Sequence, residues 1–135
     1  MNKKTISSWI RQARYRANKR NIYSDLQISD VQEIVESFDG RCAYCGKTTN
    51  CQKSEADTLD HPFPLSDDTP NVPANVLPIC KKMKATKKNH DLAWLFATGA
   101  IERDTYLRLV KFILSRRGGD TMKKHIKTIT GIQDE

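Results

Sequence analysis

Two adjacent residues near the middle of the chain, Asp60 and His61, combine a carboxylate with an imidazole. A carboxylate can bind a hard divalent ion, and a neutral imidazole can take a proton from water near neutral pH. The pair ends a short strand-like run at residues 57–61, which gives both side chains one piece of extended backbone. Asp-His pairs are also common in purely structural settings, so the neighbouring motifs decide the interpretation.

A second group with chemical potential is the run Cys42-Ala-Tyr-Cys45-Gly46. Two residues between thiolates let a tight turn direct both sulfurs at one ion, and a following glycine lets the backbone reverse. This spacing is typical of half of a zinc knuckle. Cys80 is the expected third ligand, from a second half-site further along the chain.

The fourth ligand of such a zinc site is left open by the sequence. The position at which a fourth cysteine is expected holds Met83, and a thioether is a poor zinc ligand. Water, Cys51 or His90 could complete the site. In the alternative, the knuckle binds no metal and Met83 fills the space of the ion.

The positive charge of the chain is concentrated in two blocks. The formal net charge is +7 over 135 residues, and neither residues 1–20 nor residues 81–88 contain an acidic side chain. Such blocks favour a polyanionic partner, because each neutralised phosphate releases counterions. Simple solvated faces are the alternative. The basic residues in the two blocks that concern us are Arg11, Arg14, Arg16, Lys19 and Arg20, and Lys81, Lys82, Lys84, Lys87 and Lys88.

The elements that must position these groups are mostly helical. Apolar spacing and capping residues predict helices over about 5–20 (capped by Thr5 or Ser7), 29–40 (capped by Ser29), 79–88, 91–99 (capped by Asp91), 102–117 and 120–131 (capped by Asp120). Turn formers and prolines dominate 42–78 and exclude a long helix there. The prediction is one domain, 1–135, mostly α with a small ββ element.

Composition also restricts the setting of the protein. No apolar run approaches the roughly 20 residues that span a bilayer, and the basic N-terminus lacks a signal-peptide apolar region. We therefore expect no membrane association and a cytoplasmic location, in a bacterium or a phage-infected host cell. In a reducing compartment four cysteines are more often metal ligands or plain thiols than disulfides.

Taken together, the motifs resemble the HNH endonuclease family, the ββα-metal nucleases, in particular its small phage and mobile-element members. The resemblance covers roughly residues 41–90, a little over a third of the chain. It consists of short motifs in the expected order and spacing: Cys42-x-x-Cys45, Leu59-Asp60-His61-x-x-Pro64-Leu65-Ser66, Asn75-x-Leu77-x-x-Cys80 and Lys87.

The resemblance implies a ββα-metal core at 41–90 between a basic helical N-terminal extension (1–40) and C-terminal helices (91–135). It implies that Asp60 holds a catalytic Mg²⁺ or Mn²⁺ and that His61 is the general base on the attacking water. It implies that Asn75 hydrogen-bonds within the loop and orients His61. The ion would neutralise charge on the scissile phosphate.

The sequence departs from the family pattern at Lys84, where the third catalytic position usually carries His or Asn. A charged ammonium has no lone pair and cannot ligate a metal. Lys84 could supply its own charge in place of the ion, Asn89 or His90 could substitute as a ligand, or the nuclease could be inactive and still bind DNA. A slipped alignment is the remaining alternative.

The expected function is therefore cutting or nicking of double-stranded DNA, by a monomer or a homodimer paired through the amphipathic C-terminal helices. Residues expected to contact DNA are Arg11, Arg14, Arg16, Lys19, Arg20, Lys81, Lys82, Lys87 and Lys88. The rival expectation is a catalytically dead HNH scaffold that binds DNA or inhibits nucleases. A third is a zinc-stabilised interaction module without a nucleic-acid role.

Overall fold

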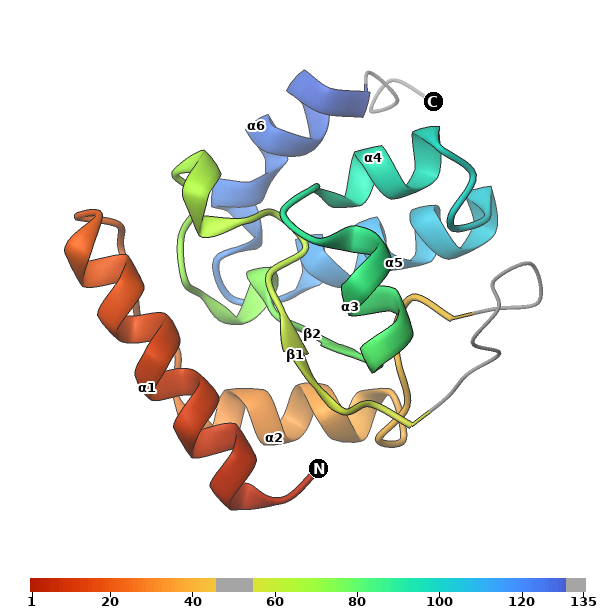
Figure 1. Ribbon diagram of the computed structural model, residues 1–135. Coiled ribbons are helices and arrows are strands. Elements are labelled where there is room, and N and C mark those ends of the chain that lie inside the picture. The colour runs from red at the N-terminus through yellow and green to blue at the C-terminus, as the bar shows by residue number, and fades with distance from the viewer. Residues whose placement is uncertain (46–54, 131–135) are drawn as a thin grey trace.

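The computed structural model describes residues 1–45 and 55–130. This part of the chain folds into six α-helices and one small antiparallel sheet (Figure 1), which confirms the predicted fold class. No helix in it is both long and apolar enough to cross a membrane. The helices are α1 (Lys3–Lys19), α2 (Ile28–Ser37), α3 (Lys81–Lys87), α4 (Leu92–Ala97), α5 (Arg103–Ser115) and α6 (Gly119–Thr130).

The sheet contains two three-residue strands, β1 (Thr58–Asp60) and β2 (Leu77–Ile79). They pair in antiparallel register with Asp60 opposite Leu77. The connection between them carries two short 3₁₀ turns, η1 (Leu65–Asp67) and η2 (Pro73–Asn75), and α3 begins two residues after β2. The chain therefore runs strand, strand, helix around Asp60.

Two hydrophobic cores lie on opposite faces of this sheet. Leu77 and Ile79 belong to the larger core, which α4, α5 and α6 cover, whereas Leu59 and Val76 belong to a smaller core with α1 and α2. Figure 1 shows α1 and α2 on one side of the strands and α4 to α6 on the other. Side chains alternate between faces along a strand, so Asp60 lies on the opposite face from Leu59.

Several helix starts differ from the predictions; α6, for example, includes Asp120, which was expected to precede it as the cap. The first helix begins earlier than expected, because the side chain of Asn2 accepts a hydrogen bond from Thr5 N at 2.8 Å and replaces Thr5 or Ser7 as the cap. The second begins at Ile28 and is capped by Gln27, whose N–H donates to Asp30 at 2.9 Å, and not by Ser29. The predicted cap of α4 is confirmed, since Asp91 accepts from Trp94 N at 2.9 Å.

Candidate functional site

The Asp60 carboxylate is buried, with 4% of the residue exposed, and both its oxygens are engaged. Oδ2 accepts a hydrogen bond from the Tyr44 hydroxyl at 2.7 Å and lies 3.2 Å from Lys87 Nζ. Oδ1 lies 3.4 Å from Lys87 Nζ and 3.6 Å from Lys84 Nζ. The ammonium groups of Lys84 and Lys87 and the phenol of Tyr44 therefore surround Asp60, which was predicted to be a metal ligand.

Lys87 is an interior residue, with 1% exposed, where a surface contact to DNA was expected. Its ammonium also donates to the His61 carbonyl at 3.0 Å. Burial lowers the pKa of Lys87, and the charge of Asp60 opposes that shift. A long cationic side chain is stable in such a position only when paired. Lys87 therefore lies on the buried face of α3, where it neutralises the charge of Asp60.

His61 is the second buried group, 8% exposed, and its pKa is lowered to about 4. Burial is the main cause, and the charges of Arg16 and Lys84 add to it. The Nε2 atom of His61 lies 2.9 Å from Asn71 Oδ1. The amide nitrogen of Asn71 in turn donates a hydrogen bond to the Ser24 hydroxyl oxygen at 2.9 Å. Because Asn71 Oδ1 accepts, Nε2 carries the proton and Nδ1 keeps the lone pair. The imidazole is neutral at pH 7.

Asn75 holds the loop that follows His61. Its amide nitrogen donates to the carbonyls of Phe63 (2.9 Å) and Pro70 (3.0 Å), and its oxygen accepts from Phe63 N at 3.1 Å. The Thr69 hydroxyl lies 3.2 Å from the same amide and donates to the Phe63 carbonyl. Asn75 is fully buried and hydrogen-bonds within the loop.

Asp60 and His61 both line a cleft of about 570 Å³, which we call the Asp60 cleft. The indole of Trp9 on α1 lies against the imidazole, with ring centroids 4.8 Å apart. The only acidic side chain among the lining residues is Asp60. Six cationic side chains line the cleft, from α1 and its C-terminus and from α3 and its C-terminus: Arg16, Lys19, Arg20, Lys84, Lys87 and Lys88.

The cleft accounts for several predicted residues and leaves others outside it. Asn89 lines it, whereas His90 stacks on Trp94 with ring centroids 3.8 Å apart and is not part of the lining. Arg11 borders a neighbouring shallow pocket on α1 with Tyr15 and Arg16. Further exposed basic residues that do not line the cleft are Arg14 on α1 and Lys81 and Lys82 at the start of α3.

The three predicted zinc ligands of the described chain lie together. Cys42, Cys45 and Cys80 are buried, and their sulfurs lie within 4.8 Å of one another, with Cys45 and Cys80 at 3.6 Å. Tetrahedral zinc with Zn–S bonds of about 2.3 Å separates its sulfurs by about 3.8 Å. This three-cysteine cluster could hold a structural metal such as zinc.

The ligand set of the cluster is incomplete within residues 1–45 and 55–130. No fourth His, Cys, Asp or Glu of that part joins it, and Cys51, one predicted fourth ligand, lies outside the described residues. Cys45 takes part in a disulfide, so a metal would require its reduced form. Cys42 and Cys80 are free thiols, and burial raises the pKa of Cys42 to about 11.

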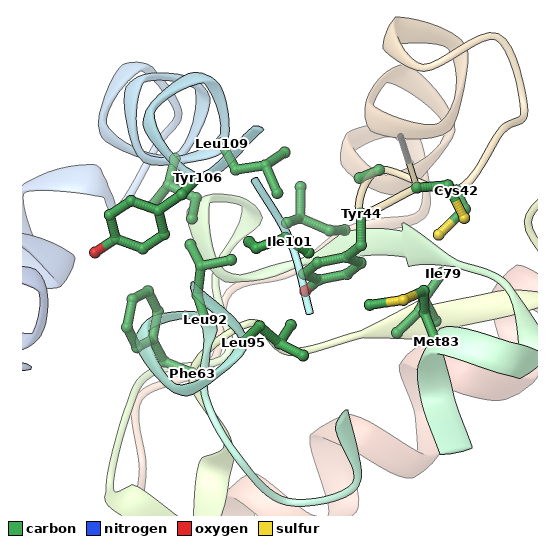
Figure 2. Close-up of a cluster of buried hydrophobic side chains, with 14 of the residues drawn as sticks. Cys42, Tyr44, Phe63, Ile79, Met83, Leu92, Leu95, Ile101, Tyr106 and Leu109 are labelled. Atoms are coloured by element: carbon green, nitrogen blue, oxygen red, sulfur yellow. The ribbon is translucent and has the colours of Figure 1, made fainter. Parts of the chain in front are cut away.

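Met83 packs beside the cluster in the larger core. It is 4% exposed and shares that core with Cys42 and Tyr44. Figure 2 shows Cys42 and Met83 at one end of this group of side chains, with Phe63 and Tyr106 at the other. The buried position of Met83 in this core suits an apolar side chain.

Tyr44 connects the cysteine cluster to the cleft, a role that sequence reasoning missed. It lies between Cys42 and Cys45, is fully buried, and its hydroxyl donates to Asp60. Burial and the charge of Asp60 raise its pKa well above the ordinary value. Its position inside the Cys-x-x-Cys motif was the only available signal. Asn71, which holds His61, lies in no recognisable motif.

Comparison with known proteins adds no assignment. No protein-family model matches the chain, and no curated protein matches it.

Proposed function

We propose that the protein binds the backbone of double-stranded DNA in the Asp60 cleft and hydrolyses its phosphodiester bonds, as an HNH-type endonuclease. The observation that carries the proposal is a neutral, buried imidazole in a cleft with six cationic side chains. A binding module alone does not need a desolvated histidine held by a dedicated Asn71–Ser24 pair.

Charge supports a phosphate ligand. The cations come from two separate helices, so they face a ligand from both sides of the cleft. Arg16, Lys19 and Lys88 are exposed, and among the described residues that line the cleft only Asp60 is negatively charged. Arg20 also pairs with Asp68, outside the lining, at 3.6 Å. Arginine and lysine in a concave, partly desolvated site concentrate the field on an anion.

In the proposed reaction, His61 accepts a proton from a water molecule through Nδ1 as the water oxygen bonds to phosphorus. The bond from phosphorus to the 3′ oxygen breaks, and that oxygen then takes a proton from solvent. The products are 5′-phosphate and 3′-hydroxyl ends. The Asn71 contact keeps Nε2 protonated and directs the basic lone pair to Nδ1.

A catalytic Mg²⁺ or Mn²⁺, which the family resemblance implies, does not fit the residues present. Such ions need several open oxygen ligands. Among the described residues Asp60 is the only carboxylate lining the cleft, and Tyr44, Lys84 and Lys87 already engage its oxygens. No step of the proposed reaction therefore passes through a divalent ion.

The same observation favours a second candidate function. A cleft that retains its cations and lacks an open metal ligand could bind DNA without cutting it. The second candidate is a catalytically inactive HNH scaffold that occupies DNA. The sequence feature that favours this candidate is Lys84, which stands where the family usually carries a catalytic His or Asn.

A plasmid-nicking assay separates the two. Supercoiled plasmid is incubated with the wild type and with His61→Ala, in Mg²⁺, in Mn²⁺ and in chelator. The endonuclease proposal expects nicking by the wild type and its loss in His61→Ala, with gel shifts retained in both. Binding without nicking in every buffer would contradict the enzyme and support the inactive scaffold.

A further inference from the structure

We propose that Lys84 supplies the positive charge beside Asp60, so that the cleft binds a phosphodiester without a divalent metal. This inference rests on the proposed function, because it concerns the same cleft and its DNA ligand. It names a metal-free, ammonium-based phosphate site in place of a metal site.

Lys84 and Lys87 hold Asp60 in different ways. Lys87 is buried and contacts both carboxylate oxygens. The side chain of Lys84 is 45% exposed, lies 3.6 Å from Oδ1 and donates to the Leu59 carbonyl at 3.1 Å. An ammonium has three donors. Lys84 therefore keeps a donor for a ligand in the cleft while it remains anchored to β1.

The local charge balance favours an anion next to Lys84. Lys87 alone can neutralise Asp60, so the charge of Lys84 is in excess. Arg16 and Lys88 line the same cleft and add to that excess. A divalent cation entering here would meet these charges and would have to displace both lysines from the carboxylate. A phosphate oxygen meets a net positive charge, because Lys84, Lys87, Arg16 and Lys88 outnumber the single carboxylate of Asp60.

Two variants with the same change of chemistry test the proposal by duplex-binding anisotropy. Lys84→Asn removes the ammonium beside Asp60, whereas Lys88→Asn removes an exposed charge elsewhere in the lining of the same cleft. At matched ionic strength the wild type is expected to bind a DNA duplex equally, within about two-fold, in chelator and in Mg²⁺. Both variants are expected to bind about three- to ten-fold more weakly in chelator. Only Lys84→Asn should regain affinity when Mg²⁺ is added.

A second measurement needs no DNA and no variant. Mn²⁺ is paramagnetic, so an ion held at Asp60 would broaden the NMR signals of the neighbouring His61 ring and leave those of His125 sharp. The proposal expects no selective broadening in the wild type. Selective broadening of His61, or binding of the duplex only in Mg²⁺, would overturn it and leave the proposed function intact. Absence of duplex binding in both buffers would instead defeat the proposed function, and the Mn²⁺ measurement would still decide whether lysine or metal occupies Asp60.

Discussion

At the scale of single residues, the centre of the molecule is a buried charge cluster. Asp60 is neutralised by Lys87 from α3, held by the hydroxyl of Tyr44 and approached by Lys84 from the cleft. His61 beside it is uncharged, because burial outweighs the attraction of Asp60. Desolvated groups of this kind are costly to bury and are typical of functional sites.

The low pKa of His61 predicts how stability depends on pH. Its pKa is about 4 in the folded protein and 6.5 in an exposed chain. Between these values the unfolded chain binds the proton and the folded chain does not, so the free energy of unfolding falls as pH drops through this window. The loss is about 3 kcal/mol between pH 6.5 and 4. Chemical denaturation at several pH values measures it.

The matched control for that prediction is His61→Gln, which cannot take up the proton. Its free energy of unfolding should fall less steeply over the same window, while any contribution of His125 remains in both proteins. Identical pH dependence in the wild type and the variant would show that His61 titrates normally.

Removal of the Lys87 ammonium should destabilise the folded protein, because the buried Asp60 carboxylate loses its main counter-charge. Lys87→Met leaves Asp60 with the Tyr44 hydrogen bond and the longer contact to the half-exposed Lys84, and we expect a loss of about 3–5 kcal/mol in the free energy of unfolding. Asp60→Asn in the same chain should restore part of it. Lys88→Met, at an exposed position, is the control with little expected effect. Equal stability of the two single variants would contradict the ion pair.

At the scale of elements, the cysteine cluster joins two segments that hold Asp60. Tyr44 lies between Cys42 and Cys45, and Cys80 caps α3, whose residues include Lys84 and Lys87. Ala43 N also donates to the Pro78 carbonyl of β2 at 2.9 Å. An ion bound by the three sulfurs would tie this turn to the start of α3.

The reduced protein is therefore expected to bind about one zinc per chain, which elemental analysis of protein purified in a phosphine reductant would measure. Cys80→Ala should lose the metal and lower the thermal midpoint. Met83→Leu, which keeps an apolar side chain in the core, should retain the metal. Zinc content unchanged by Cys80→Ala would contradict the site.

Much of this arrangement could be predicted from sequence, because it follows local rules. Helical periodicity found the helices, and the Asp60-His61 and Cys-x-x-Cys spacings found residues that lie in one cleft and one cluster. Burial of Lys87 could not be predicted, since it depends on which face of α3 packs against β1. The same holds for Asn71, whose contact with His61 arises from a loop fold and not from spacing.

At the scale of the whole molecule, the fold brings positive charge from two distant parts of the sequence onto one cleft. The last turn of α1 and the last turn of α3 are about 70 residues apart in the chain, yet both line the Asp60 cleft. The smaller core makes this possible, because Ile6 and Ile10 of α1 pack with Leu59 of β1. The N-terminal helix is thus part of the site.

DNA affinity should depend on where the charge lies and not only on its total. Reversal of Arg16 and Lys19 to Glu is expected to weaken duplex binding by at least about ten-fold and to flatten its salt dependence. Lys111→Glu with Lys123→Glu makes the same change of net charge at exposed positions outside the cleft and should cost less than about three-fold. Equal effects in anisotropy titrations would point to non-specific attraction.

The measurement that tests the central claim most directly is NMR of the three histidine side chains during titration with a short DNA duplex. If the phosphodiester backbone occupies the Asp60 cleft, the His61 ring signals shift on binding and its pKa rises from about 4, because a phosphate charge offsets the nearby cations. His125, on α6 and outside the cleft lining, should change little. Saturation with DNA that leaves the His61 signals and pKa unchanged would contradict the account.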